Sequence, residues 1–310
     1  MRAGRLAAAI ALLALSPLAL AACGGKPAEP PPPTDTQLEQ ANRAGNQALS
    51  MDKADLAVRQ YKTALQRAYE RDDATAIADV SYNLALAQMK MGDAKGALAT
   101  VRGTVGDLER RGAPVSAELY LVQAAAAYRS GDRRLADRAA QDALNHPASD
   151  PDTAPRAWFI RGLIAAQGGD RAGLAQAIAQ LPPPKPPDLQ ADRDELLGRQ
   201  ALLDGKPAEA LALFQQSATA RQLAVDYRGM ARALALAGDA ALGAGRTSDA
   251  ADLFFRAGRS AVLQGDDGTG LPLLRQAEDL ARQSNEPAMV EEIRRLRKVA
   301  QERPKQTSAS

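Results

Sequence analysis

Small and apolar residues recur along most of the chain at helical spacing. Each recurrence joins a helix carrying a small residue, a turn that often reads Gly-Asp, and a second helix. In that second helix a small residue is followed four positions later by a large one and then, after three more, by another small one. Six segments between residues 38 and 284 follow this pattern. It predicts antiparallel helix pairs, because small residues let two helices approach closely and Gly-Asp ends one helix and caps the next.

The six segments can be aligned on the first residue of the small-large-small spacing. In chain order these residues are Ala57, Ala97, Ala136, Leu174, Ala210 and Ala250. The pattern resembles the tetratricopeptide repeat, whose period is 34 residues. The interval here is 36 to 40 residues, which predicts longer helices than the minimal repeat. The resemblance implies an all-α fold, a right-handed α-α superhelix that forms a TPR-like solenoid of six to seven helical hairpins.

Beyond the sixth segment the register becomes ambiguous. Gly258, Gly265, Leu274 and Ala277 also fit the pattern, so one helix at about 247–264 can belong to two hairpins. A final amphipathic helix is expected near 287–303. It would close the stack with its polar face outward, as the ends of solenoids require.

The N-terminus has the layout of a secretory signal peptide. Arg2 and Arg5 precede the apolar run 6–20, and Ala21-Ala22-Cys23 follows. Leu20 to Cys23 resembles the lipobox of bacterial lipoproteins, which implies cleavage before Cys23 and acylation of its thiol, including palmitate. The alternative is an ordinary signal peptide that leaves Cys23 free. The next residue is glycine, not the aspartate that retains lipoproteins at the inner membrane, so we expect an outer-membrane anchor facing the periplasm.

Two proline tracts help to divide the chain. We assign 1–22 to the signal peptide, 23–36 to the lipidated cysteine and a Pro-rich tether, and 37–181 to TPR-like repeats 1–4. Residues 182–188 are a Pro-rich linker, 189–303 are repeats 5–7 with the capping helix, and 304–310 are a disordered tail. The linker is expected to be a stiff loop between repeats. A hinge between two subdomains, or a PxxP ligand for a partner, are the alternatives.

Charge and cysteine content exclude several classes. The chain has 39 Lys+Arg against 37 Asp+Glu, and removing Arg2 and Arg5 with the leader would leave equal numbers. A near-neutral chain lacks the basic footprint of a nucleic-acid binder. With a single cysteine there is no internal disulfide, so the fold must be held by its own core.

The sequence offers little for catalysis. Its only histidine, His146, lies where a helix is expected to end, so neither a zinc site nor a His-based triad can be assembled. The cluster Asp192, Asp194 and Glu195 is interpreted as the polar start of a helix. No phosphate-binding glycine motif with its Lys-Ser/Thr is present. We therefore expect no enzyme, no cofactor and no metal.

The repeat resemblance also implies which residues face the concave groove lined by the first helix of each hairpin. They are Asn42, Asn46, Tyr82, Asn83, Lys90, Tyr128, Arg129, Phe159, Gln167 and Arg199, with Arg232 and Asp239 from the sixth repeat. Asn46 and Asn83 are the candidates for binding the backbone of an extended peptide. The alternative is that both are solvated or contact a neighbouring helix. Trp158 is expected in the core. Capture of a C-terminal carboxylate is not supported, because Asn42, Glu118 and Val122 stand where basic residues are needed.

These features predict a non-enzymatic, membrane-anchored scaffold that binds a protein or extended peptide partner in the envelope. Pilotins, barrel-assembly components and adaptors of cell-wall enzymes have similar architecture. One alternative is an adaptor of an export or polysaccharide system at the inner membrane. The other is an enzyme of cell-wall turnover, which would need an acid pair facing a deep groove.

Overall fold

The computed structural model describes residues 35–147, 152–181 and 187–302. Within these ranges it contains fourteen α-helices and no strand, which confirms the all-α class. The first eight are α1 (Thr36–Ser50), α2 (Ala54–Glu70), α3 (Ala74–Lys90), α4 (Ala94–Arg111), α5 (Ala117–Arg129), α6 (Arg133–Asn145), α7 (Thr153–Gly168) and α8 (Arg171–Gln180). The remaining six are α9 (Pro187–Leu203), α10 (Pro207–Leu223), α11 (Tyr227–Gly243), α12 (Thr247–Leu263), α13 (Asp267–Gln283) and α14 (Pro287–Glu302).

Several expectations fall outside the described residues. These are the signal peptide, Cys23 and its tether, most of the Pro-rich linker, and the C-terminal tail. The linker assigned to 182–188 ends earlier than expected, because α9 already begins at Pro187. None of the described helices is both long and apolar enough to cross a membrane.

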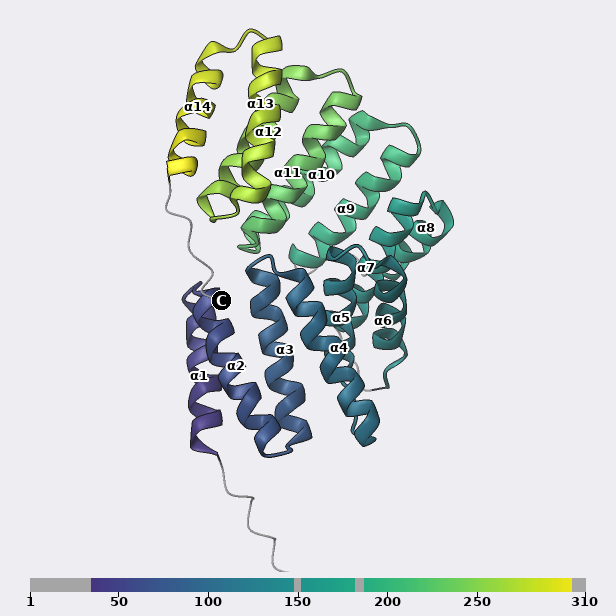
Figure 1. Ribbon diagram of the computed structural model, residues 1–310. Helices are drawn as coiled ribbons and strands as arrows, with labels where there is room; N and C mark the ends of the chain where they lie inside the picture. The colour runs from purple at the N-terminus through teal and green to yellow at the C-terminus, as the bar shows by residue number, and fades with distance from the viewer. Residues whose placement is uncertain (1–34, 148–151, 182–186, 303–310) are drawn as a thin grey trace, which may run out of the picture. The chain divides into compact units, whose positions relative to one another are not determined.

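The helices form a solenoid of hairpins. Each one packs against the next along the chain, as Figure 1 shows. In addition, α3 contacts α5, α5 contacts α7, and α7 contacts α9, so the first helices of repeats two to five adjoin one another. Phe254 of α12 packs on Gly238 of α11, and Leu274 of α13 packs on Gly258 of α12, as expected if one helix belongs to two hairpins.

The turns between helices follow the Gly-Asp expectation at four places. Gly92, Gly131, Gly169 and Gly265 all have positive φ, and the aspartate after each accepts a hydrogen bond from a backbone N–H in the first turn of the next helix. An aspartate in this position is a strong N-cap, and glycine adopts the left-handed conformation without steric cost. The sequence therefore predicted these four turns correctly.

Small residues meet large side chains inside the hairpins. A Cβ added at Gly45 would lie 2.5 Å from the ring of Tyr61, and one at Gly198 would lie 2.6 Å from the ring of Phe214. Repeat four differs, because the large side chain nearest to Gly162 is Leu196 of α9, while α8 contributes only the small Ala177. The glycine therefore allows a large side chain to cover its helix, within the hairpin in repeats one, five and six and from the next hairpin in repeat four.

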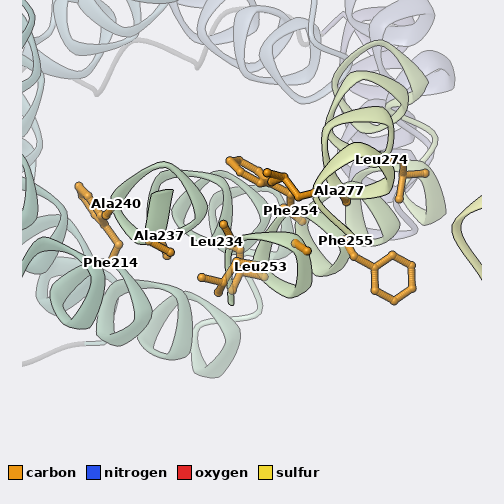
Figure 2. Close-up of a cluster of buried hydrophobic side chains, with 14 of the residues drawn as sticks. Phe214, Leu234, Ala237, Ala240, Leu253, Phe254, Phe255, Leu274 and Ala277 are labelled. Carbon is orange, nitrogen blue, oxygen red and sulfur yellow. The ribbon is translucent and has the colours of Figure 1, made fainter. Parts of the chain in front are cut away.

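The largest hydrophobic cluster lies in the C-terminal part of the chain, from Ala201 to Ala300. Phe214, Leu253, Phe254 and Leu274 are almost completely buried in it, and Figure 2 shows them among alanines of neighbouring helices. The repeats before α9 have four smaller clusters, each shared by adjacent helices. The core is thus built repeat by repeat, as in other solenoids.

Helix α14 is held to α13 by one buried carboxylate. Glu278 on α13 accepts hydrogen bonds from Arg282 of its own helix and from Arg294 and Arg297 of α14. Burial alone would raise the pKa of Glu278, but Arg294, Arg282 and Arg297 outweigh it and lower the pKa. The capping helix therefore combines an apolar contact, through Val290 and Ile293, with a charge-assisted one.

Candidate functional site

Half of the ten main groove candidates surround one hollow. Its volume is about 410 Å³, and we call it the central hollow. Residues of α3, α5, α7, α9, α10 and α11 line it, with Asp226 from the turn before α11. The expected groove residues at this hollow are Tyr82, Tyr128, Arg129, Phe159 and Arg199, together with Arg232 from the sixth repeat.

The other candidates lie elsewhere. Asn42 and Asn83 line a second hollow of about 670 Å³, beside α3 and the segment before α5, and Tyr82 borders both hollows. Lys90 makes a 2.8 Å ion pair with Asp52. Gln167 donates a 2.9 Å hydrogen bond to the hydroxyl of Tyr128. It therefore supports a residue of the central hollow without lining it.

Asn46 and Asn83 are not brought together around one hollow. The Asn46 side chain accepts a 2.6 Å hydrogen bond from the hydroxyl of Tyr61 on α2, and Asn46 lines neither of the two hollows. This is the contact to a neighbouring helix that was the alternative for Asn46. Asn83 is half-buried at the second hollow. Asp239, the last sixth-repeat candidate, is exposed.

One wall of the central hollow is apolar. Leu86 and Met89 come from α3, Leu121 and Val122 from α5, and Phe159, Ile160 and Leu163 from α7. These helices bring apolar residues to the hollow because α5 packs on both α3 and α7. An apolar wall with a few polar groups is the usual composition of a ligand-binding hollow.

The hollow is also lined by a buried ion-pair network centred on Arg221 of α10, whose guanidinium lies 5.9 Å from the ring centre of Phe159. One terminal nitrogen of its guanidinium lies 2.8 Å from Asp192 and 2.9 Å from Glu195, both on α9. The other terminal nitrogen lies 3.0 Å from Asp226, which also caps α11. Arg199 adds a 2.8 Å bond to Glu195. The side chains of Arg221 and Glu195 are only 7% and 1% exposed, so these charges are largely removed from water.

The two carboxylates that α9 contributes to this network titrate differently. Burial raises the pKa of Asp192 to about 6, although Arg221 opposes the shift. Burial would also raise the pKa of Glu195, but Arg232, Arg199 and Arg221 together outweigh it and lower the pKa. Desolvation disfavours a charge and opposite charges favour it, so the number of arginines around each carboxylate sets the outcome.

The interpretation of the acidic cluster as a helix start is wrong. Helix α9 begins at Pro187, so only Asp188 lies in its first turn. Asp192 and Glu195 lie in the second and third turns and are buried against α10. The available signal was the spacing of Glu195 and Arg199, which predicts an ion pair on one face of a helix. Nothing local indicated Arg221, because it follows 26 residues after Glu195.

His146 was expected at the end of a helix and Trp158 in the core. His146 follows the last residue of α6 as its C-cap and borders the second hollow. Trp158 is half-buried and packs against the cluster around Leu163, with the guanidinium of Arg161 4.9 Å from its ring centre. Among the described residues there is no group of three His, Cys, Asp or Glu side chains that could hold a metal ion.

No protein-family model matches the chain, and no curated protein matches it. Several solved structures are similar in fold. A tetratricopeptide repeat protein from Parabacteroides merdae is 14% identical, with 86% of this chain and 100% of that one covered, at a TM-score of 0.49. The TPR2AB-domain:pHSP90-complex of yeast Sti1 is 15% identical over 85% and 98%, at 0.36. The MamA protein is 16% identical over 74% and 95%, also at 0.36. The hairpin assignment therefore rests on this chain's own helices and contacts.

Proposed function

We propose that this protein is a non-enzymatic, membrane-anchored scaffold that holds an extended segment of a protein partner along the first helices of its hairpins. The observation that carries the proposal is the succession of contacts from α3 to α5, α7 and α9. These helices place Tyr82, Tyr128 and Phe159 around the central hollow. Half-buried aromatic side chains in a hollow are typical anchors of a protein interface.

The anchor is proposed from the sequence alone. The lipobox-like Leu20 to Cys23, with a glycine after the cysteine, supports acylation of Cys23 and an outer-membrane position facing the periplasm. Several acyl chains would attach the chain stably, because each buried methylene contributes about 0.8 kcal/mol. An envelope-assembly role of the pilotin, barrel-assembly or cell-wall-adaptor type fits this position. An adaptor of an export or polysaccharide system at the inner membrane is the alternative.

The alternative function, an enzyme of cell-wall turnover, would need an acid pair facing a groove. Asp192 and Glu195 do border the central hollow. Both carboxylates, however, bind the same nitrogen of Arg221, at 2.8 and 2.9 Å. Carboxylates engaged in this way serve as the counter-ions of a buried arginine. This arrangement favours a structural role and supports the scaffold over the enzyme.

The anchor is tested by replacing the cysteine. Cys23→Ala removes the acylated thiol, so the protein should lose incorporation of labelled palmitate and leave the membrane fraction. Fractionation on a density gradient also separates outer from inner membrane for the unchanged protein. Membrane association that survives Cys23→Ala at full strength would contradict the proposed anchor.

Partner binding is tested by cross-linking in cells and purification of the intact protein. Tyr82→Ala/Phe159→Ala removes two aromatic side chains of the central hollow, and we expect the dominant cross-linked partner to fall by about tenfold or more. The matched control is Tyr69→Ala/Tyr227→Ala, which removes two exposed aromatic side chains outside this hollow. Thermal melting of both variants checks that each is folded. Equal loss of the partner in both variants would contradict the groove assignment.

A further inference from the structure

The central hollow carries more positive than negative charge. Five arginines line it (Arg129, Arg156, Arg199, Arg221 and Arg232) against three carboxylates (Asp192, Glu195 and Asp226). Asp188, outside the lining, pairs with Arg156, so the surplus is one positive charge. A partly enclosed hollow with a surplus of one sign attracts ligands of the other sign, because low-dielectric walls strengthen the field inside it.

Two of the five arginines have no carboxylate partner. Arg156 pairs with Asp188 at 3.1 Å, Arg199 pairs with Glu195, and Arg221 holds all three carboxylates of the hollow. Arg129 at the end of α5 and Arg232 on α11 make neither a hydrogen bond nor an ion pair with any residue that the structure describes. Their guanidinium groups are therefore available to a ligand.

The positive charge of Arg232 disfavours the charge of Arg129. Burial lowers the pKa of Arg129, and the positive charge of Arg232 lowers it further. In the same network Arg232 is the arginine that contributes most to lowering the pKa of Glu195. An anion placed between Arg129 and Arg232 would relieve their repulsion. An arginine guanidinium is well suited to this, because its planar fork binds carboxylates through two parallel hydrogen bonds.

The apolar wall restricts which anion fits. Leu86 and Met89 of α3 and Phe159 of α7 line the hollow, and the guanidinium of Arg221 lies 5.9 Å from the centre of the Phe159 ring. A hydrated inorganic ion would leave this wall without a contact. A carboxylate joined to an apolar group would satisfy the apolar wall and the arginines at once, because burial of apolar surface adds to the charge-assisted hydrogen bonds.

We propose that the central hollow binds an acidic side chain of the partner segment, with the carboxylate between Arg129 and Arg232 and an adjacent apolar side chain against Leu86, Met89 and Phe159. This inference rests on the proposed function, since it specifies the chemistry of the segment that the groove holds. The lining spans helices from α3 to α11, which suits an extended chain that crosses several repeats. The hollow thus selects partners by an acidic residue beside an apolar one.

The chemistry of the hollow can be tested without knowing the partner. Met89 lies in the apolar wall, so its side-chain methyl group reports on occupancy when the chain is labelled with ¹³C-methyl methionine. Met89→Leu assigns this signal among the six methionines. Octanoate and octanamide are the probes, because they share an apolar chain and differ in charge. We expect octanoate to shift the Met89 signal with an affinity about tenfold higher than that of octanamide.

Variants locate the anion. Arg129→Gln/Arg232→Gln should remove about tenfold or more of the octanoate affinity and leave octanamide binding unchanged. The matched control is Arg102→Gln/Arg275→Gln, which removes two exposed arginines outside the hollow and should change neither affinity by more than about twofold. Circular dichroism checks the fold of each variant. Equal affinities for octanoate and octanamide, or octanoate binding unaffected by Arg129→Gln/Arg232→Gln, would overturn the proposal.

A second arm distinguishes a peptide from a small amphipathic acid. Acetyl-Leu-Glu-Phe-amide and acetyl-Leu-Gln-Phe-amide differ only in the central charge. The proposal predicts that the Glu peptide shifts the Met89 signal with the higher affinity and that Arg129→Gln/Arg232→Gln abolishes the difference. If only octanoate depends on the two arginines, the occupant is a small amphipathic acid and the peptide assignment is wrong. These experiments need no partner, so their outcome is separate from that of partner cross-linking in cells.

Discussion

At the scale of single residues, one turn has a β-branched residue at the left-handed position, where the other turns with positive φ have glycine, aspartate or asparagine. Val225 occupies the place that glycine holds in the Gly-Asp turns, directly before the capping residue Asp226. Its φ is 60°, in the left-handed region that a β-branched side chain disfavours. The side chain is 67% exposed, so little packing compensates for this conformation. The turn before α11 is therefore strained by its own sequence.

We predict that Val225→Gly stabilises the protein. Relief of the left-handed conformation contributes about 1–2 kcal/mol, and the greater freedom of glycine in the unfolded chain offsets part of it, which leaves roughly 0.5–1 kcal/mol. Thermal unfolding measures this effect, and Val225→Gly should melt at a higher temperature than wild type. The matched control is Gly245→Val, which creates the same conflict at a glycine with φ of 73° and should lower the melting temperature.

Asp192 should give the protein a measurable pH dependence. Its pKa is raised from 3.8 to about 6 in the folded state, so the folded protein binds the proton more tightly than the unfolded chain does. The free energy of unfolding therefore falls as the pH rises through 6. Between pH 5 and pH 7 the loss attributable to Asp192 should be roughly 1 kcal/mol.

Urea unfolding at pH 5 and pH 7 measures this loss when wild type is compared with Asp192→Asn. All other titratable groups are common to both proteins, so the difference between the two pH dependences isolates Asp192. Asp192→Asn should lose less stability than wild type between the two pH values. Identical pH dependences would show that Asp192 stays charged over this range in the folded protein.

At the scale of elements, the sequence predicted most of the helix pairs but not the buried ion pairs. Spacing of small and large residues predicted the hairpins, the shared helix α12 and the capping helix α14, because these depend on contacts between residues close in sequence. The linker was expected to run to residue 188, although α9 begins at Pro187. The acidic residues Asp192, Asp194 and Glu195 of α9 were interpreted as the polar start of a helix. Asp192 and Glu195 pair with Arg221 on another helix, and such a pairing has no local signal.

Helix α14 offers a test of how the solenoid is closed. Glu278→Gln keeps the size of the side chain but removes the charge that binds Arg282, Arg294 and Arg297. We expect unfolding to become easier by about 1–3 kcal/mol and hydrogen exchange to accelerate first in α14. Glu291→Gln is the control, because its 3.4 Å pair with Arg295 is exposed and should contribute little. Unchanged exchange in α14 would exclude Glu278 as its attachment.

At the scale of the whole molecule, repeats two to five bring one side of their first helices together, and the central hollow lies there. The sequence identified Tyr82, Tyr128, Arg129, Phe159 and Arg199 as groove residues, and the structure brings them around one hollow. It did not identify the network of Asp192, Glu195 and Arg221. Groove positions recur with the repeat and can be counted along the chain, whereas the network depends on how α9, α10 and α11 pack.

The claim that a protein partner occupies this hollow is most directly tested by site-specific photo-cross-linking in living cells. A photo-reactive phenylalanine analogue replaces Phe159 in the hollow or, in the control, Leu263, which is 69% exposed on α12. If the partner occupies the hollow, one dominant cross-linked protein should form from position 159 and none of it from position 263. Cross-linking of the same protein from position 263 alone would contradict the account.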